Sequence, residues 1–137
     1  MNMNIKDIKN TEIKGDKLEL IFQRQKELED KYKKIEQDNG FYVPNTIDLD
    51  NAHDQLYVKN LTHRVIEELE EGMNCLKNKP WKQTQMETDK EHFVEELADG
   101  FHFYIALLLS IDMSAEDLFQ IYFKKSEVNK FRQRSRY

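Results

Sequence analysis

Apolar residues recur at intervals of three to four positions along most of the chain, which is typical of α-helices with one buried face. The pattern predicts four main helices: Asp16 to about residue 36, Asp50 or Asn51 to about Lys77, Thr88 to Ser110, and one that begins at Ser114. Asp16 and Thr88 are each followed three residues later by Glu, as in a capping box, and Ser114 with Asp117 can cap the last helix. We therefore expect an all-α protein.

The segments between these helices define the domain organisation. Residues 1–15 are polar and lack helical periodicity, so they are predicted to form a flexible lead-in. Residues 37–51 contain Asn39-Gly40 and Pro44-Asn45 and are predicted to be a long connection. The remaining residues, 16–137, are sufficient for one helical domain, with a basic C-terminal tail from about residue 129.

Composition supports this fold class and indicates a cellular location. Four Gly and two Pro in 137 residues argue against a turn-rich β fold. The single cysteine, Cys75, excludes an internal disulfide framework and fits a reducing compartment. The longest apolar run, residues 103–109, is too short to cross a bilayer. We expect a cytoplasmic protein.

Charge is unevenly distributed along the chain. The net charge of −5 argues against general nucleic-acid binding. The last fourteen residues reverse the sign, because six Lys and Arg residues stand there against one acid, Glu127. A basic end of this kind is more often simply solvated, and the alternative is that it binds phosphate.

Acidic residues interrupt the third predicted helix, whose segment from Val94 to Ser110 is otherwise one of the most apolar in the chain. Glu96 and Asp99 lie one turn apart on the same side, close enough to bind one cation together. Because a buried ionised carboxylate is costly unless it is paired, this helix predicts either basic partners or a divalent ion.

The second predicted helix carries four glutamates at positions 67, 68, 70 and 71, beside an apolar stripe that includes Val65, Leu69 and Met73. Helical geometry leaves two pairs, Glu68/Glu71 and Glu67/Glu70, nearly tied for the inward position. Either pair, packed against Glu96 and Asp99, would supply four carboxylates for a hard ion such as Mg²⁺. If the basic tail folds back near such a site, metal ions and cationic side chains together suit the hydrolysis of a phosphoanhydride. Since no Ser, Cys or Lys stands in an evident activating setting, direct attack by water is the simpler chemistry.

Several short motifs follow one another in order: Gln25 to Asp30, Glu68-Leu69-Glu70-Glu71, Trp81, Glu96-x-x-Asp99, His102-Phe103, and Asn129-x-Phe131-Arg132 with Tyr137. This series resembles the all-α NTP pyrophosphatase superfamily of MazG and the dimeric dUTPases, and most closely the dimeric dUTPase branch. That branch often writes its first acidic pair as E-L-x-E, which favours Glu68 and Glu71. The compact length is similar to that of phage-encoded members.

The resemblance implies a four-to-five-helix bundle that works as a homodimer and hydrolyses dUTP to dUMP and pyrophosphate. It implies that Glu68, Glu71, Glu96 and Asp99 bind two or three Mg²⁺ ions, with Mn²⁺ as a substitute. The substrate contacts that it implies are Gln25 and Trp81 with uracil, His102 and Phe103 with deoxyribose, and Asn129, Lys130, Arg132 and Tyr137 with phosphate. Neither nucleic acid nor a membrane is an expected partner.

Three other functions are alternatives. The first is the same fold acting on another dNTP, such as dCTP, or on several, because the metal site recognises phosphate and not base. The second is a di-iron carboxylate bundle, but such bundles take E-x-x-H from two helices, and here only Asp99-x-x-His102 is similar. The third is a non-enzymatic helical regulatory protein whose acidic faces are merely solvated.

Overall fold

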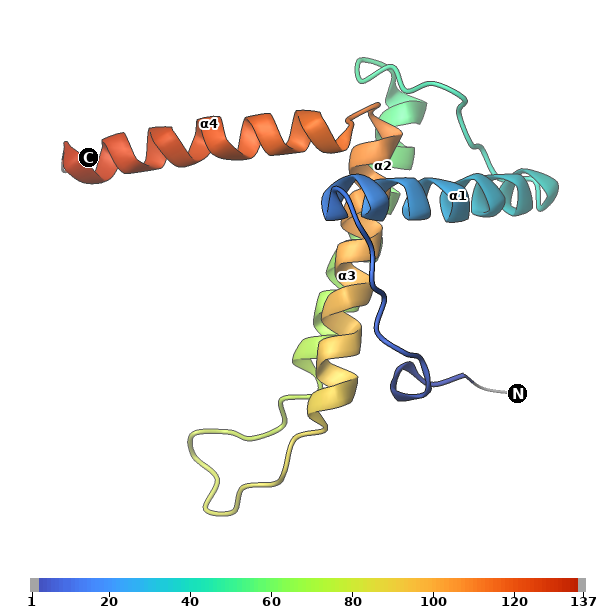
Figure 1. The fold of residues 1–137 in the computed structure, drawn as a ribbon. Coiled ribbons are helices and arrows are strands. Elements are labelled where there is room, and N and C mark those ends of the chain that lie inside the picture. The colour runs from blue at the N-terminus through green and yellow to red at the C-terminus, as the bar shows by residue number, and fades with distance from the viewer. Residues whose placement is uncertain (1–2, 136–137) are drawn as a thin grey trace.

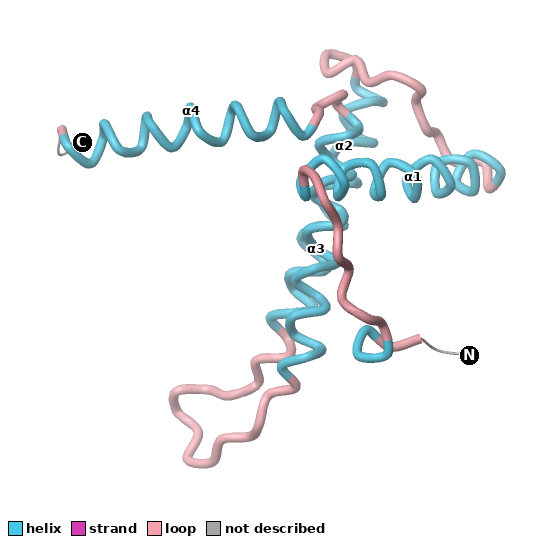
Figure 2. The backbone as a smooth tube through the Cα atoms, viewed as in Figure 1, coloured by secondary structure: helices cyan, strands magenta, loops and turns pink. Residues whose placement is uncertain are grey.

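The computed structural model describes residues 3–135, and all regular secondary structure in this part of the chain is helical. One 3-10 turn, η1 (Ile5–Asp7), precedes four α-helices: α1 (Lys17–Asp38), α2 (Ala52–Met73), α3 (Lys90–Ser110) and α4 (Ala115–Arg134). Within residues 3–135 there is no strand, and Figure 1 and Figure 2 show helices joined by irregular loops. The all-α prediction is confirmed.

Polar side chains cap the N-termini of the α-helices. The Asp16 carboxylate accepts hydrogen bonds from two backbone N–H groups of the first turn of α1, and Asn51 does the same for α2. Ser114 and Asp117 form a reciprocal capping box at the start of α4. Each cap satisfies N–H groups that have no partner inside the helix, so the helices begin where the sequence supplies these side chains.

Two predicted helix boundaries are wrong. Asp89 caps α3 through a bond of 3.1 Å from the backbone N–H of His92, and Thr88 does not, because Asp89 directly precedes the first helical residue. Helix α2 ends at Met73 and not near Lys77. The N–H groups of Cys75 and Leu76 bond three residues back, to Gly72 and Met73, so the α-helical pattern ends there.

The α2–α3 hairpin is the body of the molecule. Helices α2 and α3 run side by side in opposite directions and are joined by the loop 74–89 (Figure 1). Helix α1 crosses the hairpin near its other end, and α4 starts at that end and extends away from it. The chain bends by 102° between α3 and α4. As a result, α4 forms an arm on a three-helix body.

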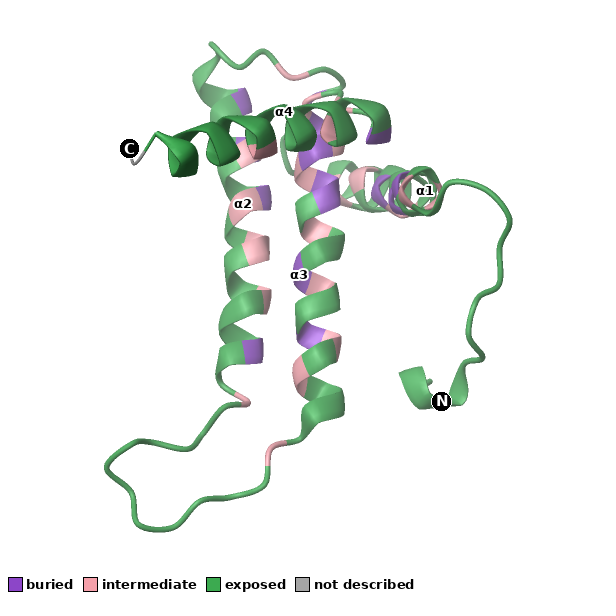
Figure 3. Cartoon of the chain, turned by 60° about the vertical axis from the view of Figure 1, so that its left-hand side comes forward, coloured by how far each residue is buried: buried purple, intermediate pink, exposed green. Residues whose placement is uncertain are grey.

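Two clusters of buried apolar side chains hold the body together. The first joins α1, α3 and α4 and consists of Phe22, Ile105, Leu108 and Ala115. The second joins the connection after α1 to α2 and consists of Val43, Tyr57 and Leu61. Both lie in the half of the hairpin that α1 crosses, and Figure 3 shows buried positions concentrated there. In the other half, the buried residues of α2 and α3 are Gly72, Glu96 and Gly100.

Helix α3 is not enclosed by other helices along its first half. Val94, Leu97 and Phe101 remain 49%, 40% and 43% exposed, whereas Ile105 is fully buried. The reason is that α1 crosses only the second half of α3, while α4 leaves the hairpin altogether (Figure 1). One face of the hairpin therefore stays open to solvent in a single chain.

The lead-in contributes little to the packed body. From residue 3 to residue 15 it contains only the turn η1 as regular structure, and its side chains are exposed. Among the residues that the structure describes, no single helix is long and apolar enough to cross a membrane. Helices α3 and α4 pass that test only as a bent pair.

Candidate functional site

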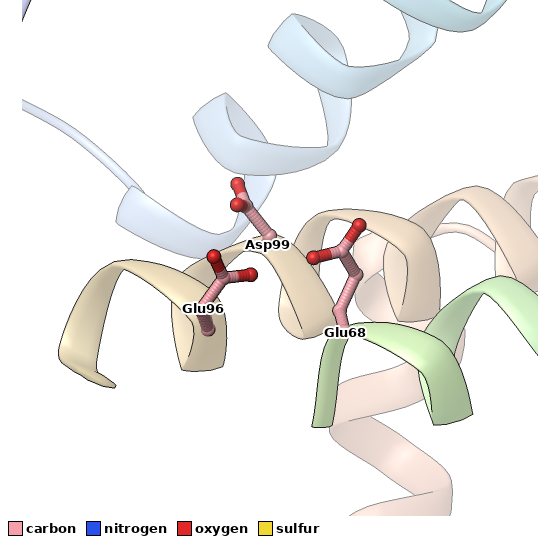
Figure 4. Close-up of side chains that lie close together, drawn as sticks. All are labelled: Glu68, Glu96 and Asp99. Atoms are coloured by element: carbon pink, nitrogen blue, oxygen red, sulfur yellow. The ribbon is translucent and has the colours of Figure 1, made fainter. Parts of the chain in front are cut away.

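Three acidic side chains from two helices meet on one face of the hairpin. Glu68 belongs to α2, whereas Glu96 and Asp99 lie one turn apart on α3. Each offers a carboxylate oxygen, and these oxygens all lie within 4.8 Å of one another. Figure 4 shows the three carboxylates gathered between the helices. We call these three residues the acidic cluster, and their spacing is suited to sharing one cation.

Two glycines allow α2 and α3 to approach closely beside the cluster. A Cβ atom on Gly72 would lie 3.4 Å from Cβ of Glu96, and one on Gly100 would lie 3.2 Å from Cδ2 of Leu69 and 3.9 Å from Cβ of Glu68. The sequence analysis did not single out these glycines. A signal was present, because each stands four residues after an acid of the cluster and would be costly in a helix without a packing reason.

The surroundings of Glu68 raise its pKa. Burial, a hydrogen bond with Glu96, and the negative charges of Glu71, Asp99 and Glu96, in that order, raise the pKa of Glu68 from 4.5 to about 7. A raised pKa is the expected result when several carboxylates share a partly desolvated site. Near neutral pH, partial protonation of Glu68 therefore offsets some of the negative charge of the cluster.

Glu96 is the most buried member of the cluster. Glu96 is only 8% exposed, and its Oε2 has no hydrogen-bond partner among the described residues. The other oxygen, Oε1, lies 3.5 Å from Nε2 of His92. A buried carboxylate oxygen without a partner costs stability, and a cation bound to the cluster would remove that cost. The donor set consists of oxygens, which suits Mg²⁺ or Mn²⁺.

Two histidines stand at the rim of the cluster. His102, which the sequence analysis selected, has Nδ1 3.8 Å from Oδ1 of Asp99, and His92, which it missed, pairs with Glu96 as described. The signal for His92 was its position one turn before Glu96. Both imidazoles are more than half exposed, so they border the site and do not fill it.

The four glutamates of α2 are not equivalent. Glu68 is partly buried and faces α3, whereas Glu67, Glu70 and Glu71 are exposed. Glu71 lies outside the acidic cluster, although its charge acts on Glu68. The structure thus brings together three of the four predicted acids and leaves Glu71 beside them.

A cavity of about 500 Å³ lies on another part of α2, and it contains none of the clustered acids. Its lining includes Glu67, so this member of the alternative pair Glu67/Glu70 faces the cavity and not α3. Arg64 also lines it and forms an ion pair of 2.7 Å with Glu36 of α1. This basic partner compensates Glu36, and no comparable Lys or Arg pair is found for the acidic cluster within residues 3–135.

Gln25, the predicted base contact, is buried on α1. Its Nε2 donates a hydrogen bond of 3.0 Å to Oε1 of Glu29, which is also buried. Burial raises the pKa of Glu29, and the hydrogen bond from Gln25 and the charge of Arg64 oppose that shift. The amide of Gln25 is therefore held in one orientation, with its carbonyl oxygen unused by Glu29.

The other predicted contacts within the body are distributed around the hairpin. Trp81 is 78% exposed in the loop 74–89, which closes the end of the hairpin nearer the acidic cluster. His102 and Phe103 follow Asp99 by about one turn on α3, and Phe103 is partly buried. The loop and α3 thus flank the cluster, although Trp81 is not packed against it.

The predicted phosphate contacts lie elsewhere. Asn129, Lys130 and Arg132 are exposed in the last turns of α4, which project away from the hairpin in Figure 1. Tyr137 lies outside the described residues. Residues 129–134 are not an irregular tail, because they continue α4. Residues 115–134 contain neither Gly nor Pro that would break the helix.

The chain was compared with known proteins. A family model described as dUTPase matches residues 17–114, which include α1, α2, α3 and the acidic cluster but not α4. No curated protein and no solved structure matches the chain. The match therefore includes the acids, Gln25, Trp81, His102 and Phe103, and it excludes the basic residues of α4.

Proposed function

The chain belongs to the dUTPase family, and on this premise we propose that it hydrolyses dUTP to dUMP and pyrophosphate in a reaction that requires Mg²⁺. The observation that carries the proposal is the acidic cluster, whose oxygens lie within 4.8 Å of one another. The unpartnered oxygen of Glu96 supports a cation there. A merely solvated acidic face would not bury a carboxylate oxygen without a partner.

Glu68, Glu96 and Asp99 would hold the metal, and Mn²⁺ is an acceptable substitute for Mg²⁺ at such oxygen ligands. A bound divalent ion supplies positive charge that stabilises the developing charge on phosphate and lowers the pKa of bound water. Because three carboxylates converge here and Glu71 stands next to them, the site has enough negative charge for two or three ions.

Glu71 is the residue that we assign to proton transfer. It is exposed, it lies outside the acidic cluster, and its charge is close enough to affect Glu68. A carboxylate that is not a metal ligand can accept the proton of an attacking water. The oxygen of that water then bonds to phosphorus, the α–β anhydride bond breaks, and pyrophosphate leaves with the bonding electron pair.

Gln25 and Glu29 provide a physical basis for base selection. Since the Nε2 of Gln25 donates to Glu29, its Oε1 remains an acceptor. Uracil presents a ring N–H to such an acceptor, whereas the same ring position of cytosine is itself an acceptor. Trp81 supplies an exposed ring that can stack on a base, and His102 and Phe103 stand beside Asp99 for the sugar.

The test is product analysis with each dNTP and Mg²⁺. We expect dUMP and pyrophosphate from dUTP, with kcat/KM about tenfold or more above the values for dCTP and dTTP. Chelation should abolish turnover, and Mg²⁺ or Mn²⁺ should restore it. Glu29→Gln should lower the ratio of dUTP to dCTP turnover, while Glu27→Gln, an exposed neighbour on α1, should leave it unchanged.

Two outcomes would contradict different parts of the proposal. Equal kcat/KM for dUTP, dCTP and dTTP would refute base selection but keep the pyrophosphatase. Failure to hydrolyse any dNTP with Mg²⁺ or Mn²⁺ would refute the enzymatic function itself.

A further inference from the structure

Helix α1 carries three polar residues on one side, and two of them are buried. Gln25, Glu29 and Glu36 are separated by four and then seven residues, so they lie within about 40° of one another round the helix axis. Gln25 and Glu29 are only 4% and 6% exposed. Because a buried carboxylate is costly unless its charge is compensated, the groups that face this side of α1 determine the state of Glu29.

Helix α2 supplies a basic residue to this side of α1, where α1 crosses the hairpin (Figure 1). Nη2 of Arg64 lies 2.7 Å from Oε1 of Glu36, and the two side chains are 34% and 23% exposed. The charge of Arg64 also acts on Glu29, which stands about two turns before Glu36 on α1. One guanidinium, held in place by an ion pair, therefore serves two carboxylates of the same helix.

The charge of Glu29 depends on both members of that ion pair. Among the described residues, Lys33 and Glu36 of α1 and Arg64 and Tyr57 of α2 are the charged or titratable groups that act on Glu29. Burial raises the pKa of Tyr57 to about 12, so its hydroxyl is neutral near neutral pH. Burial also raises the pKa of Glu29, the amide hydrogen bond and then Arg64 lower it, Glu36 raises it and Lys33 lowers it. Arg64 thus attracts the charge of Glu29 and also offsets the repulsion from Glu36.

The protonation state of Glu29 determines which atom of the Gln25 amide is left for a ligand. An ionised carboxylate only accepts hydrogen bonds, so it selects Nε2 of Gln25, as in the observed bond of 3.0 Å. A protonated carboxyl group can donate to Oε1 instead, and the amide then presents its NH₂ group. The first arrangement offers an acceptor to the ring N–H of uracil, and the second offers a donor to the ring nitrogen of cytosine. Protonation of Glu29 therefore reverses the base that the amide matches.

We propose that Arg64 is a positioning residue for base selection, which holds Glu29 as a carboxylate and so keeps the carbonyl oxygen of Gln25 available to the substrate. Glu36 fixes the place of Arg64, although its own negative charge acts against that of Glu29. The effect on base selection rests on the proposed function. The effect of Arg64 on the charge of Glu29 does not.

Two variants break the same ion pair but change the charge near Glu29 in opposite directions. The ratio of kcat/KM for dUTP to that for dCTP is measured from about pH 8 to about pH 5.5, above the ordinary pKa of Glu. For Arg64→Gln, the ratio should fall roughly threefold to tenfold as the pH falls, because each unit of pKa changes protonation tenfold. For Glu36→Gln, it should stay at the wild-type value. If both variants lowered the ratio equally, the ion pair would only hold the helices together and the proposal would be wrong.

Controls separate the charge of Arg64 from its packing. Arg64→Lys keeps the charge and should recover most of the ratio, and the proposal fails if it behaves like Arg64→Gln. Lys59→Gln removes a positive charge from an exposed position of the same helix and should follow the wild type. An equal fall for Lys59→Gln would attribute the effect to net charge and would overturn the proposal. Glu68 also titrates in this range, but the metal site serves both substrates alike, so its effect cancels in the ratio.

The charge of Glu29 is measured without any need for activity, by ¹³C NMR of its side-chain carboxyl carbon, with Glu29→Gln to assign the signal. The titration midpoint should lie at higher pH in Arg64→Gln than in the wild type, and at lower pH in Glu36→Gln. The side-chain ¹⁵N signal of Gln25 should change at the same midpoint. A midpoint that Arg64→Gln leaves unmoved would overturn the proposal. Should Arg64→Gln not fold, Glu36→Gln decides, and a midpoint at or above the wild-type value would overturn it.

The proposed function and this inference fail in different ways. Midpoints that move as expected, in a protein that hydrolyses no dNTP, would refute the proposed function alone. Unmoved midpoints in a protein that prefers dUTP would refute the role of Arg64 alone. Midpoints that move while the ratio stays constant would show that the charge of Glu29 does not select the base, which would overturn the inference and keep the enzyme.

Discussion

In the α2–α3 hairpin, two capped helices pack along their length and bring three carboxylates together. Helix α4 is capped equally well, by Ser114 and Asp117, but only its first turn packs against the body. The difference shows that caps and periodicity determine where a helix forms, whereas its position depends on a surface that fits it. The hairpin finds that surface within one chain, and α4 does not.

The hairpin and α4 also differ in the charge and exposure of their side chains. Around the acidic cluster, close helix approach at Gly72 and Gly100 desolvates carboxylates that pair with no Lys or Arg within residues 3–135. On α4, rings that would normally be buried face solvent and basic residues have only Glu127 nearby in sequence. The hairpin therefore carries buried negative charge that a cation would offset, whereas α4 carries exposed rings and exposed basic residues.

The largest effect should come from the acid that is most buried. Glu96→Gln should lower turnover of dUTP roughly a thousandfold, more than the 10–100-fold typical of outer-shell partners of a metal. The same change should raise the melting temperature in a chelator, because a neutral amide removes one charge from the cluster. Steady-state kinetics and thermal melts, with and without Mg²⁺, provide the two measurements.

Glu95→Gln is the matched control for that change, since Glu95 is the neighbouring residue on α3 and lies outside the cluster. It should leave turnover within about twofold, because Glu95 is half-buried but contributes no oxygen to the cluster. If Glu95→Gln and Glu96→Gln lowered turnover equally, the acidic cluster would not be the metal site.

The next effect sharpens the contrast in packing. Leu61 of α2 is only 1% exposed, so Leu61→Ala should lower the free energy of unfolding by about 2–5 kcal/mol. Phe123 of α4 is 51% exposed, so Phe123→Ala should change the free energy of unfolding of a single chain by no more than about 0.5 kcal/mol. Urea unfolding at several protein concentrations distinguishes the two.

For Leu61→Ala, the loss should be present at every protein concentration. For Phe123→Ala, a larger loss that shrinks as the concentration falls would indicate a contact with a second chain. A loss of equal size at every concentration for both variants would mean that α4 stabilises its own chain.

Much of the fold was accessible from the sequence because its signals are local. The apolar period and the side chains of Asp16, Asn51 and Ser114 predicted helices that the structure contains. The misplaced cap of α3 is an error of one residue, between two neighbouring polar side chains that can each accept a hydrogen bond. The sequence did not predict that α4 extends away from the body. The apolar period shows which face of a helix is apolar, but it does not show which element covers that face.

The acidic cluster was accessible in part. The spacing of Glu96 and Asp99 placed them on one side of α3, and the E-L-x-E resemblance selected the register in which Glu68 faces α3. The sequence did not predict that Glu68 faces α3 while Glu71 stays outside the cluster. Where Gly72 brings α2 close to α3, only a narrow part of the α2 surface faces α3. His92 was overlooked, although its spacing from Glu96 is helical.

The smallest effect concerns the pH dependence of stability when a chelator keeps metal from the acidic cluster. The pKa of Glu68 is raised from 4.5 to about 7, so the folded chain binds more protons than the unfolded chain between these values. Stability in a chelator should therefore fall as pH rises from about 4.5 to about 7, and Glu68→Gln should remove this part of the dependence. Because Glu68 is only partly buried, we expect the variant to melt about 2–4 °C above the wild type at pH 8, with little difference at pH 4.5. Mg²⁺ at pH 8 should reverse the order, since the wild-type carboxylate binds the ion and the amide does so weakly.

Glu70→Gln, an exposed acid of the same helix, serves as the control and should follow the wild type. Parallel melting curves for Glu68→Gln and Glu70→Gln across this pH range would show that Glu68 does not carry the shared proton, and the cation site on the hairpin would lose its electrostatic support.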